Sequence, residues 1–148
     1  MGSKLKKQSN FKPLPVDNGD ECFPNGIFEF NITKMLDFIN QCDSIQPEPV
    51  KVTGFWHSGE NANEDHLPTV DLTKPIIIAE IAPDRYNIID GNHRVEKAKR
   101  ENIETLPAYR IKASDHVRFL TSQKSYLCYV DYWNDKVTEI RKHEEMMK

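Results

Sequence analysis

The stretch of sequence that decides the fold reads Asn87-Ile88-Ile89-Asp90-Gly91-Asn92-His93-Arg94-Val95-Glu96-Lys97-Ala98. It begins with apolar residues, passes through an Asp-Gly pair and continues with residues of high helix propensity. This change of pattern predicts a buried strand that runs directly into a helix. We expect the strand over 85–89 and the helix over 92–102, with Asn102 in the left-handed conformation that ends many helices.

A strand-to-helix junction of this composition favours an anion as ligand. Gly91 permits a sharp turn and a close approach, and the unpaired amides of a first helical turn attract phosphate. Arg94 adds a guanidinium fork, and His93 can donate to a phosphate or move a proton near neutral pH. Asp90 can hold Mg²⁺ or accept a proton from an attacking hydroxyl. We therefore predict phosphate binding by Gly91, Asn92, His93 and Arg94, catalytic roles for Asp90 and His93, and a metal-ligand role for Asp90.

A purely structural interpretation of the same residues is open as well. Asp-Gly is a common turn signal, and Asp90 could cap the helix through its carboxylate. Arg94 could pair with a nearby carboxylate to fix the helix. The concentration of Asp, Asn, His and Arg in consecutive positions favours the functional interpretation, because a turn alone does not require it.

The segments around the junction predict alternating strands and helices. Apolar runs at 75–81 and 85–89 predict a hairpin, and 107–111 predicts a further strand. Upstream, 26–30 reads as a strand, and Asn31 stands at the N-cap of a helix that ends near Gln41. The apolar face of that helix follows the i, i+3, i+4, i+7 spacing and consists of Ile32, Met35, Leu36 and Ile39.

The remaining segments are less regular. Prolines exclude a helix from 1–26, which we interpret as an extended arm. Alternation predicts a strand over 50–56, before a polar loop at 58–68. The His and acidic residues in and beside this loop are better explained by solvation than by metal binding; they are His57, Glu60, Glu64, Asp65 and His66.

The C-terminal third is expected to be mainly helical. Ser114 and Asp115 open a helix that runs through Thr121. The aromatic segment 127–133 could be a strand or a helix, and 134–148 is expected to be a charged helix.

Length and composition indicate one α+β domain over 27–148, with a small mixed sheet and packed helices. The chain has 148 residues, of which 29% are charged and 38% hydrophobic, as in globular proteins. It is expected to fold alone or as a small oligomer. With 20 basic and 23 acidic residues, the net charge of -3 provides no general attraction for DNA, so any DNA contact would be local.

The sequence points to a reducing, aqueous location. It has no apolar run of membrane-spanning length and no secretion signal near its start, so we predict a cytoplasmic protein without membrane contact. Its 3 cysteines lack the spacing of a zinc site and are expected to be buried free thiols.

The junction resembles the ParB-like domain of the ParB and sulfiredoxin superfamily. The residues that carry the resemblance are Asp90-Gly91-Asn92-His93-Arg94, then Ala98, then Leu106-Pro107-Ala108-Tyr109. The resemblance to this domain is good over about 50–111 and looser over 27–41. In that family a Gly-x-x-Arg helix start binds nucleotide phosphates, which implies this role for Gly91 and Arg94. Members bind CTP, ATP or ADP, and they include chromosome-partition clamps, sulfiredoxins, a free-serine kinase with an Asp-Gly-x-His-Arg motif, and relatives described as nucleases.

Departures from the family narrow the expected function. Asn92 stands where sulfiredoxins have their catalytic Cys, so sulfinic acid reduction is not expected. The segment after Ile111 is too short for an obvious helix-turn-helix DNA reader. The kinase also uses an acid from its N-terminal region, and Glu29 and Glu48 lie in the comparable part of this chain. The leading hypothesis is therefore a nucleotide-binding protein, with Mg²⁺ and a nucleoside di- or triphosphate, that hydrolyses or transfers a phosphate. The alternative is a non-catalytic DNA-associated or regulatory module.

Overall fold

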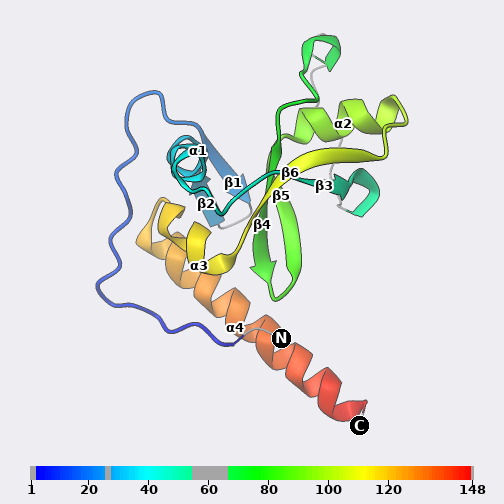
Figure 1. Cartoon of the computed structure of the whole chain (residues 1–148). Helices are drawn as coiled ribbons and strands as arrows, with labels where there is room; N and C mark the ends of the chain where they lie inside the picture. The colour runs from blue at the N-terminus through cyan, green and yellow to red at the C-terminus, as the bar shows by residue number, and fades with distance from the viewer. Residues whose placement is uncertain (1–2, 26–27, 55–66, 148) are drawn as a thin grey trace.

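A four-stranded mixed sheet carries the strand-to-helix junction (Figure 1). The structure is a computed structural model that describes residues 3–25, 28–54 and 67–147. The sheet has the order β3-β6-β4-β5 and consists of β3 (Glu48–Lys51), β4 (Ile76–Ala82), β5 (Arg85–Asp90) and β6 (Thr105–Ile111). The central strands β4 and β6 are parallel, and each edge strand is antiparallel to its neighbour. The predicted hairpin is confirmed as β4 and β5.

Helix α2 (Asn92–Arg100) connects β5 to β6 and covers one face of this sheet. Its apolar residues Val95 and Ala98 are fully buried against Ile76 and Ile78 of β4. The predicted end of the helix is confirmed, because Asn102 has a φ of 58°.

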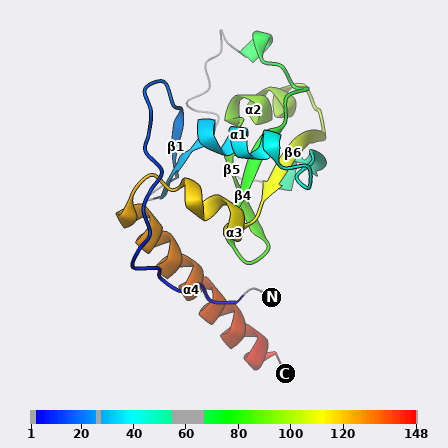
Figure 2. The same ribbon diagram turned by 60° about the vertical axis from the view of Figure 1, so that its left-hand side comes forward.

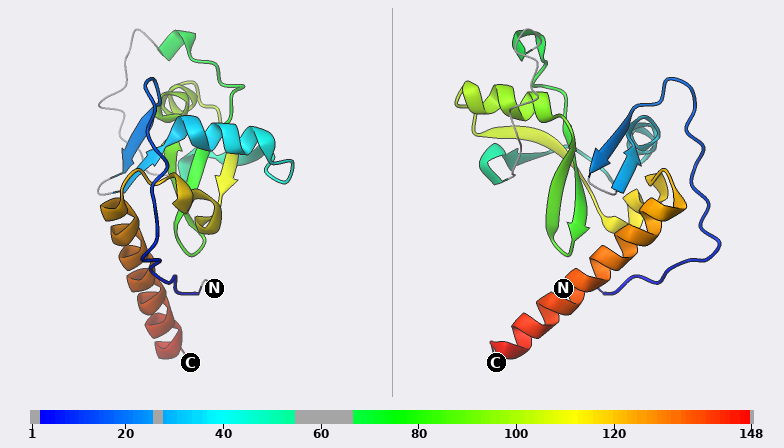
Figure 3. Two further views of the ribbon diagram at one scale, coloured as in Figure 1. Left: turned by 90° about the vertical axis from the view of Figure 1, so that its left-hand side faces the viewer. Right: turned by 180° about the vertical axis from the view of Figure 1, so that it is seen from behind.

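The opposite face of the sheet forms a second and larger core. Side chains alternate along β4, so Ile77, Ala79 and Ile81 join this core while Ile76 and Ile78 face α2. Three helices cover this face: α1 (Ile32–Gln41), α3 (Ala113–His116) and α4 (Gln123–Met146) (Figures 1 and 3). A mixed sheet between helices confirms the α+β class.

Helix α1 begins as predicted from the sequence. The Asn31 side chain accepts a hydrogen bond from the amide of Lys34, as an N-cap should, and the helix ends at Gln41. Strand β2 (Phe28–Asn31) precedes it and pairs antiparallel with β1 (Cys22–Asn25) in a separate small sheet beside α1 (Figure 2).

The N-terminal arm is attached to α4 before it reaches β1 (Figure 1). Residues 3–21 contain no helix or strand. Their backbone is nevertheless bound: the Asn134 side chain accepts from Leu5 N at 2.8 Å and donates to Leu5 O at 3.0 Å. The Trp133 indole donates to Ser3 O at 2.8 Å. The expected arm is therefore extended, yet it is docked, and it leads into a strand that the sequence analysis missed.

Three expectations about secondary structure need correction. The strand predicted over 50–56 corresponds to β3, which begins earlier, at Glu48, and ends at Lys51 because the chain enters a 3-10 turn over Val52–Gly54. Residues 55–66, which include most of the predicted polar loop, lie outside the described part of the chain. Helix α3 begins at Ala113 and gives way to a 3-10 turn before Thr121. The segment 127–133 is helical, so its strand alternative is wrong.

The cysteines are free, as expected, but they are half-buried rather than fully buried. No helix in the described ranges combines the length and apolar character that a membrane crossing needs.

Candidate functional site

The junction between β5 and α2 turns at Gly91, which is the N-cap residue of α2 with a φ of 106°. A Cβ at this position would lie 2.4 Å from Ile76 Cγ2, so glycine is required for steric as well as conformational reasons. Gly91 has no side chain with which to cap the first turn of α2, and within the described ranges no hydrogen bond joins this turn to the Asp90 carboxylate. The capping role considered for Asp90 is therefore not what the structure shows.

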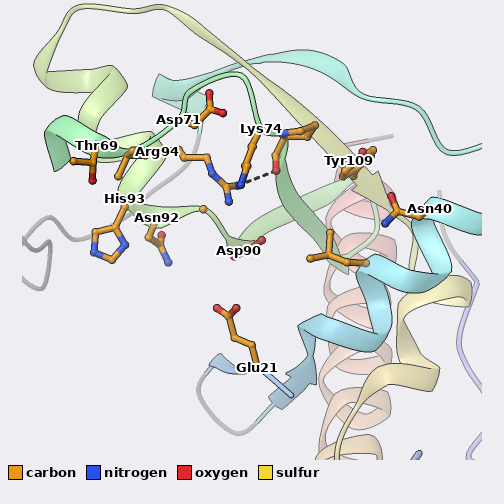
Figure 4. Close-up of a pocket in the computed structure, with 14 residues that line it drawn as sticks. Glu21, Asn40, Thr69, Asp71, Lys74, Asp90, Asn92, His93, Arg94 and Tyr109 are labelled. Carbon is orange, nitrogen blue, oxygen red and sulfur yellow. Dashed lines mark hydrogen bonds between the residues drawn. The ribbon is translucent and has the colours of Figure 1, made fainter. Parts of the chain in front are cut away.

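A pocket of about 750 Å³ opens beside this turn (Figure 4). Its walls come from the end of the arm, α1, the loop before β4, the β5–α2 junction and β6. The lining residues are Glu21, Leu36, Asn40, Thr69, Val70, Asp71, Lys74, Pro75, Asp90, Gly91, Asn92, His93, Arg94 and Tyr109. All the site residues predicted from the sequence, Asp90 to Arg94, therefore line a single pocket.

Arg94 lies in the pocket wall rather than in bulk solvent. Its Nη1 donates to Pro75 O at 2.8 Å, which ties the first turn of α2 to the start of β4. Within the described ranges Arg94 forms no ion pair with a carboxylate, so the alternative in which such a pair fixes the helix has no support. The bond to Pro75 uses one of the N–H groups of a guanidinium, which has several to offer.

Asp90 is half-buried, and its surroundings raise the pKa of its carboxyl group. Burial is the main cause, and the negative charge of Glu21 adds to it, while Arg94 and the Gly91 amide act in the opposite direction. A carboxyl group with a raised pKa at the edge of a pocket is a common feature of sites that transfer protons or hold cations.

Glu21 is the functional candidate that the sequence analysis missed. It directly precedes β1, and Figure 4 shows its carboxylate directed toward Asp90 from the other side of the pocket. The acids considered earlier lie elsewhere: Glu29 accepts from Thr121 Oγ1 at 2.5 Å, and Glu48 pairs with Arg110 at 2.7 Å. No local pattern marks Glu21, because only the path of the arm brings it to the pocket.

The loop before β4 was also missed, and it adds charge to the pocket. Asp71 accepts from the amide of Thr73 at 2.9 Å and from its hydroxyl at 2.6 Å, which lowers the pKa of Asp71. Lys74 follows on the same loop and lines the pocket near Arg94. Lys97 of α2 holds the loop in place by donating to Val70 O at 2.9 Å.

Metal binding at this site would depend on few protein ligands. The residues that the structure describes include no group of three His, Cys, Asp or Glu side chains that could hold an ion. Glu21 and Asp90 are the carboxylates that face each other here. Mg²⁺ commonly uses one or two carboxylates together with substrate phosphates and water, so this pair fits that ion when a phosphate ligand is present.

Comparison of the chain with protein-family models, with curated proteins and with solved structures gave no match in any of the three.

Proposed function

We propose that this pocket binds a nucleoside di- or triphosphate with Mg²⁺ and transfers or hydrolyses its terminal phosphate, in a domain of the ParB and sulfiredoxin type. The observation that carries the proposal is the start of α2 at Gly91, a residue without a capping side chain, which lines the same pocket as Arg94 and Lys74. Helix N-termini and cationic side chains are the groups that proteins combine to bind phosphate. A volume of about 750 Å³ is in the range of small-molecule sites.

The chemistry would divide between the two sides of the pocket. The amides of the first turn of α2, with Arg94 and His93, bind and orient the phosphate. Asp90 and Glu21 hold the cation, which supplies charge neutralisation on the phosphate oxygens. One carboxylate of this pair accepts the proton of the attacking hydroxyl. The hydroxyl oxygen bonds to the terminal phosphorus while the bond from that phosphorus to the bridging oxygen of the leaving phosphate breaks. With water as acceptor the reaction is hydrolysis, and with an alcohol it is transfer.

A thermal-shift series tests the proposal directly. A ligand that binds the native state raises the melting temperature. CTP, ATP, ADP and GTP, each with and without Mg²⁺, should include at least one that stabilises the protein. Release of phosphate or labelling of an alcohol then measures turnover. Stabilisation without turnover would identify a non-catalytic module, whereas no shift with any nucleotide at millimolar concentration would overturn the proposal.

Replacing Arg94 by alanine should weaken nucleotide binding about tenfold or more. Charge-assisted hydrogen bonds contribute about 1.5–3 kcal/mol, and this guanidinium faces the proposed phosphate position. Arg100→Ala is the matched control, since Arg100 lies on the same helix, pairs with Glu96 and does not line the pocket. Titration calorimetry measures both dissociation constants. Equal affinity in the two variants would place the phosphate elsewhere.

Asp90→Asn should separate turnover from binding. The amide keeps the size of the side chain but cannot accept the proton or ligate the cation as a carboxylate does, so turnover should fall about 100-fold or more. The melting temperature should not fall at neutral pH, because the raised pKa shows that the fold disfavours the ionised form of Asp90. Asp131→Asn, at an exposed residue of α4, is the control. An Asp90→Asn protein with full turnover would contradict this role.

A further inference from the structure

The backbone of Glu21 is held at both of its polar groups by the first turn of α1. Its amide donates to Thr33 Oγ1 at 2.8 Å. Its carbonyl accepts from the Ile32 amide at 2.8 Å and from the Thr33 amide at 3.4 Å. The arm therefore satisfies free amides of the helix, and the helix in turn fixes this one residue of the arm.

The residues just before Glu21 are bound to the same turn. Asp20 Oδ2 accepts from Asn31 Nδ2 at 2.9 Å, and Lys34 Nζ lies 3.3 Å from the same oxygen and 2.6 Å from Asp17 Oδ2. The hydrogen bond from Asn31 is the main cause of the lowered pKa of Asp20. The arm is thus fastened to the start of α1 through Asp17, Asp20 and Glu21.

The side chain of Glu21 has no comparable support. Among the described residues its carboxylate forms no hydrogen bond or ion pair, and it extends into the pocket toward Asp90 (Figure 4). Its location is therefore set by the main chain. Of the groups that hold this main chain, the hydroxyl of Thr33 is the one supplied by a side chain.

We infer that Thr33 is a positioning residue, whose hydroxyl holds the Glu21 amide so that the Glu21 carboxylate faces Asp90 across the pocket. The inference rests on the proposed function for what Glu21 does there. Small displacements of a reacting group are costly, and about 1 Å can reduce turnover by 100-fold. Thr33 neither lines the pocket nor needs to touch the nucleotide for this effect.

Thr33→Val tests the inference, because valine keeps the shape of threonine and removes the acceptor oxygen. Hydrogen exchange at the Glu21 amide, followed by NMR, should become about tenfold faster or more, while exchange in the later turns of α1 stays unchanged. Thr33→Ser restores the oxygen and should restore the parent rate. Thr138→Val is the matched control on α4, where the threonine hydroxyl donates to Asn134 O.

Turnover gives the second measurement. Thr33→Val should lower kcat about tenfold or more with nucleotide affinity unchanged within about twofold, and it should add nothing to Glu21→Gln in the double variant. Parent-like exchange at Glu21 in Thr33→Val, or additive losses with Glu21→Gln, would overturn the positioning role. A parent protein that binds nucleotide without turnover would refute the catalytic part of the proposed function, and the exchange measurement alone would then decide whether Thr33 holds Glu21.

Discussion

Gly91→Ala is expected to lower the free energy of unfolding by about 3 kcal/mol, of which roughly 1–2 come from a side chain at positive φ and the rest from overpacking. The added Cβ would lie 2.4 Å from Ile76 Cγ2 and 2.9 Å from Ile76 Cβ. Ile76 is 1% exposed and belongs to the central strand β4, so it cannot move aside without disturbing the sheet. Denaturant unfolding at constant pH measures the change.

Gly19→Ala is a control for the conformational part of this effect. Gly19 has a φ of 92°, close to that of Gly91, but a Cβ there would meet nothing within 4 Å. It should therefore cost only about 1–2 kcal/mol. Equal losses at the two glycines would show that the contact with Ile76 does not matter, and that the turn tolerates a side chain on its inner surface.

The stability of the protein should decline by about 3 kcal/mol between pH 6.5 and pH 4 because of one residue, His116. This side chain is fully buried, and burial lowers its pKa from 6.5 to about 4. The unfolded chain takes up a proton near pH 6.5, whereas the native state resists it until about pH 4. The contribution of His116 to the free energy of unfolding is therefore fully present above pH 6.5. It is lost as the pH falls from 6.5 to 4, at about 1.4 kcal/mol per pH unit.

The surroundings of His116 explain why it stays neutral. Its Nε2 lies 2.6 Å from Glu80 O, and this carbonyl also accepts from the Tyr129 hydroxyl at 2.8 Å. The rings of Phe30 and Tyr129 pack edge-on against the imidazole. Nδ1 is buried without a hydrogen-bond partner among the described residues, so a proton placed there would be desolvated and unpaired.

Urea unfolding at several pH values checks this prediction. The quantity to compare is the slope of the free energy of unfolding against pH, not its absolute value. His116→Gln should be less stable than the parent at pH 7. Its free energy of unfolding should fall less between pH 6.5 and pH 4, because glutamine does not take up a proton. His143→Gln, on the exposed end of α4, should keep the parent slope. If the parent and His116→Gln have the same slope, then His116 does not titrate as its burial requires.

The elements that could be predicted from the sequence are those with local causes. Helix α1 follows from its apolar spacing and from Asn31 as N-cap, and the β5–α2 junction follows from the change of pattern at Gly91. Helix α4 could also have been recognised. Its buried residues Tyr126, Tyr129, Val130, Trp133 and Val137 follow the helical spacing, but the strand propensity of aromatic residues obscured it.

The parts of the site that could not be predicted depend on contacts between distant segments. Asp90 and Arg94 are four residues apart and meet in one turn, so local pattern was sufficient to find them. Glu21, Lys74 and Tyr109 reach the same pocket from the arm, from a loop and from β6, and nothing in their neighbours along the chain indicates a common destination. The same holds for His116, whose burial comes from packing against Phe30 and Tyr129 of other segments and not from its own segment.

The hydrogen bond from the Trp133 indole to Ser3 O makes this tryptophan an optical probe of the arm. Trp133 is 4% exposed while residues 3–5 lie against α4, and departure of the arm would leave its N–H facing water. Its emission then shifts to longer wavelength, and with Trp56 replaced by phenylalanine it is the remaining tryptophan signal of the chain. Attachment of the segment that carries Glu21 can thus be followed in solution without any added label.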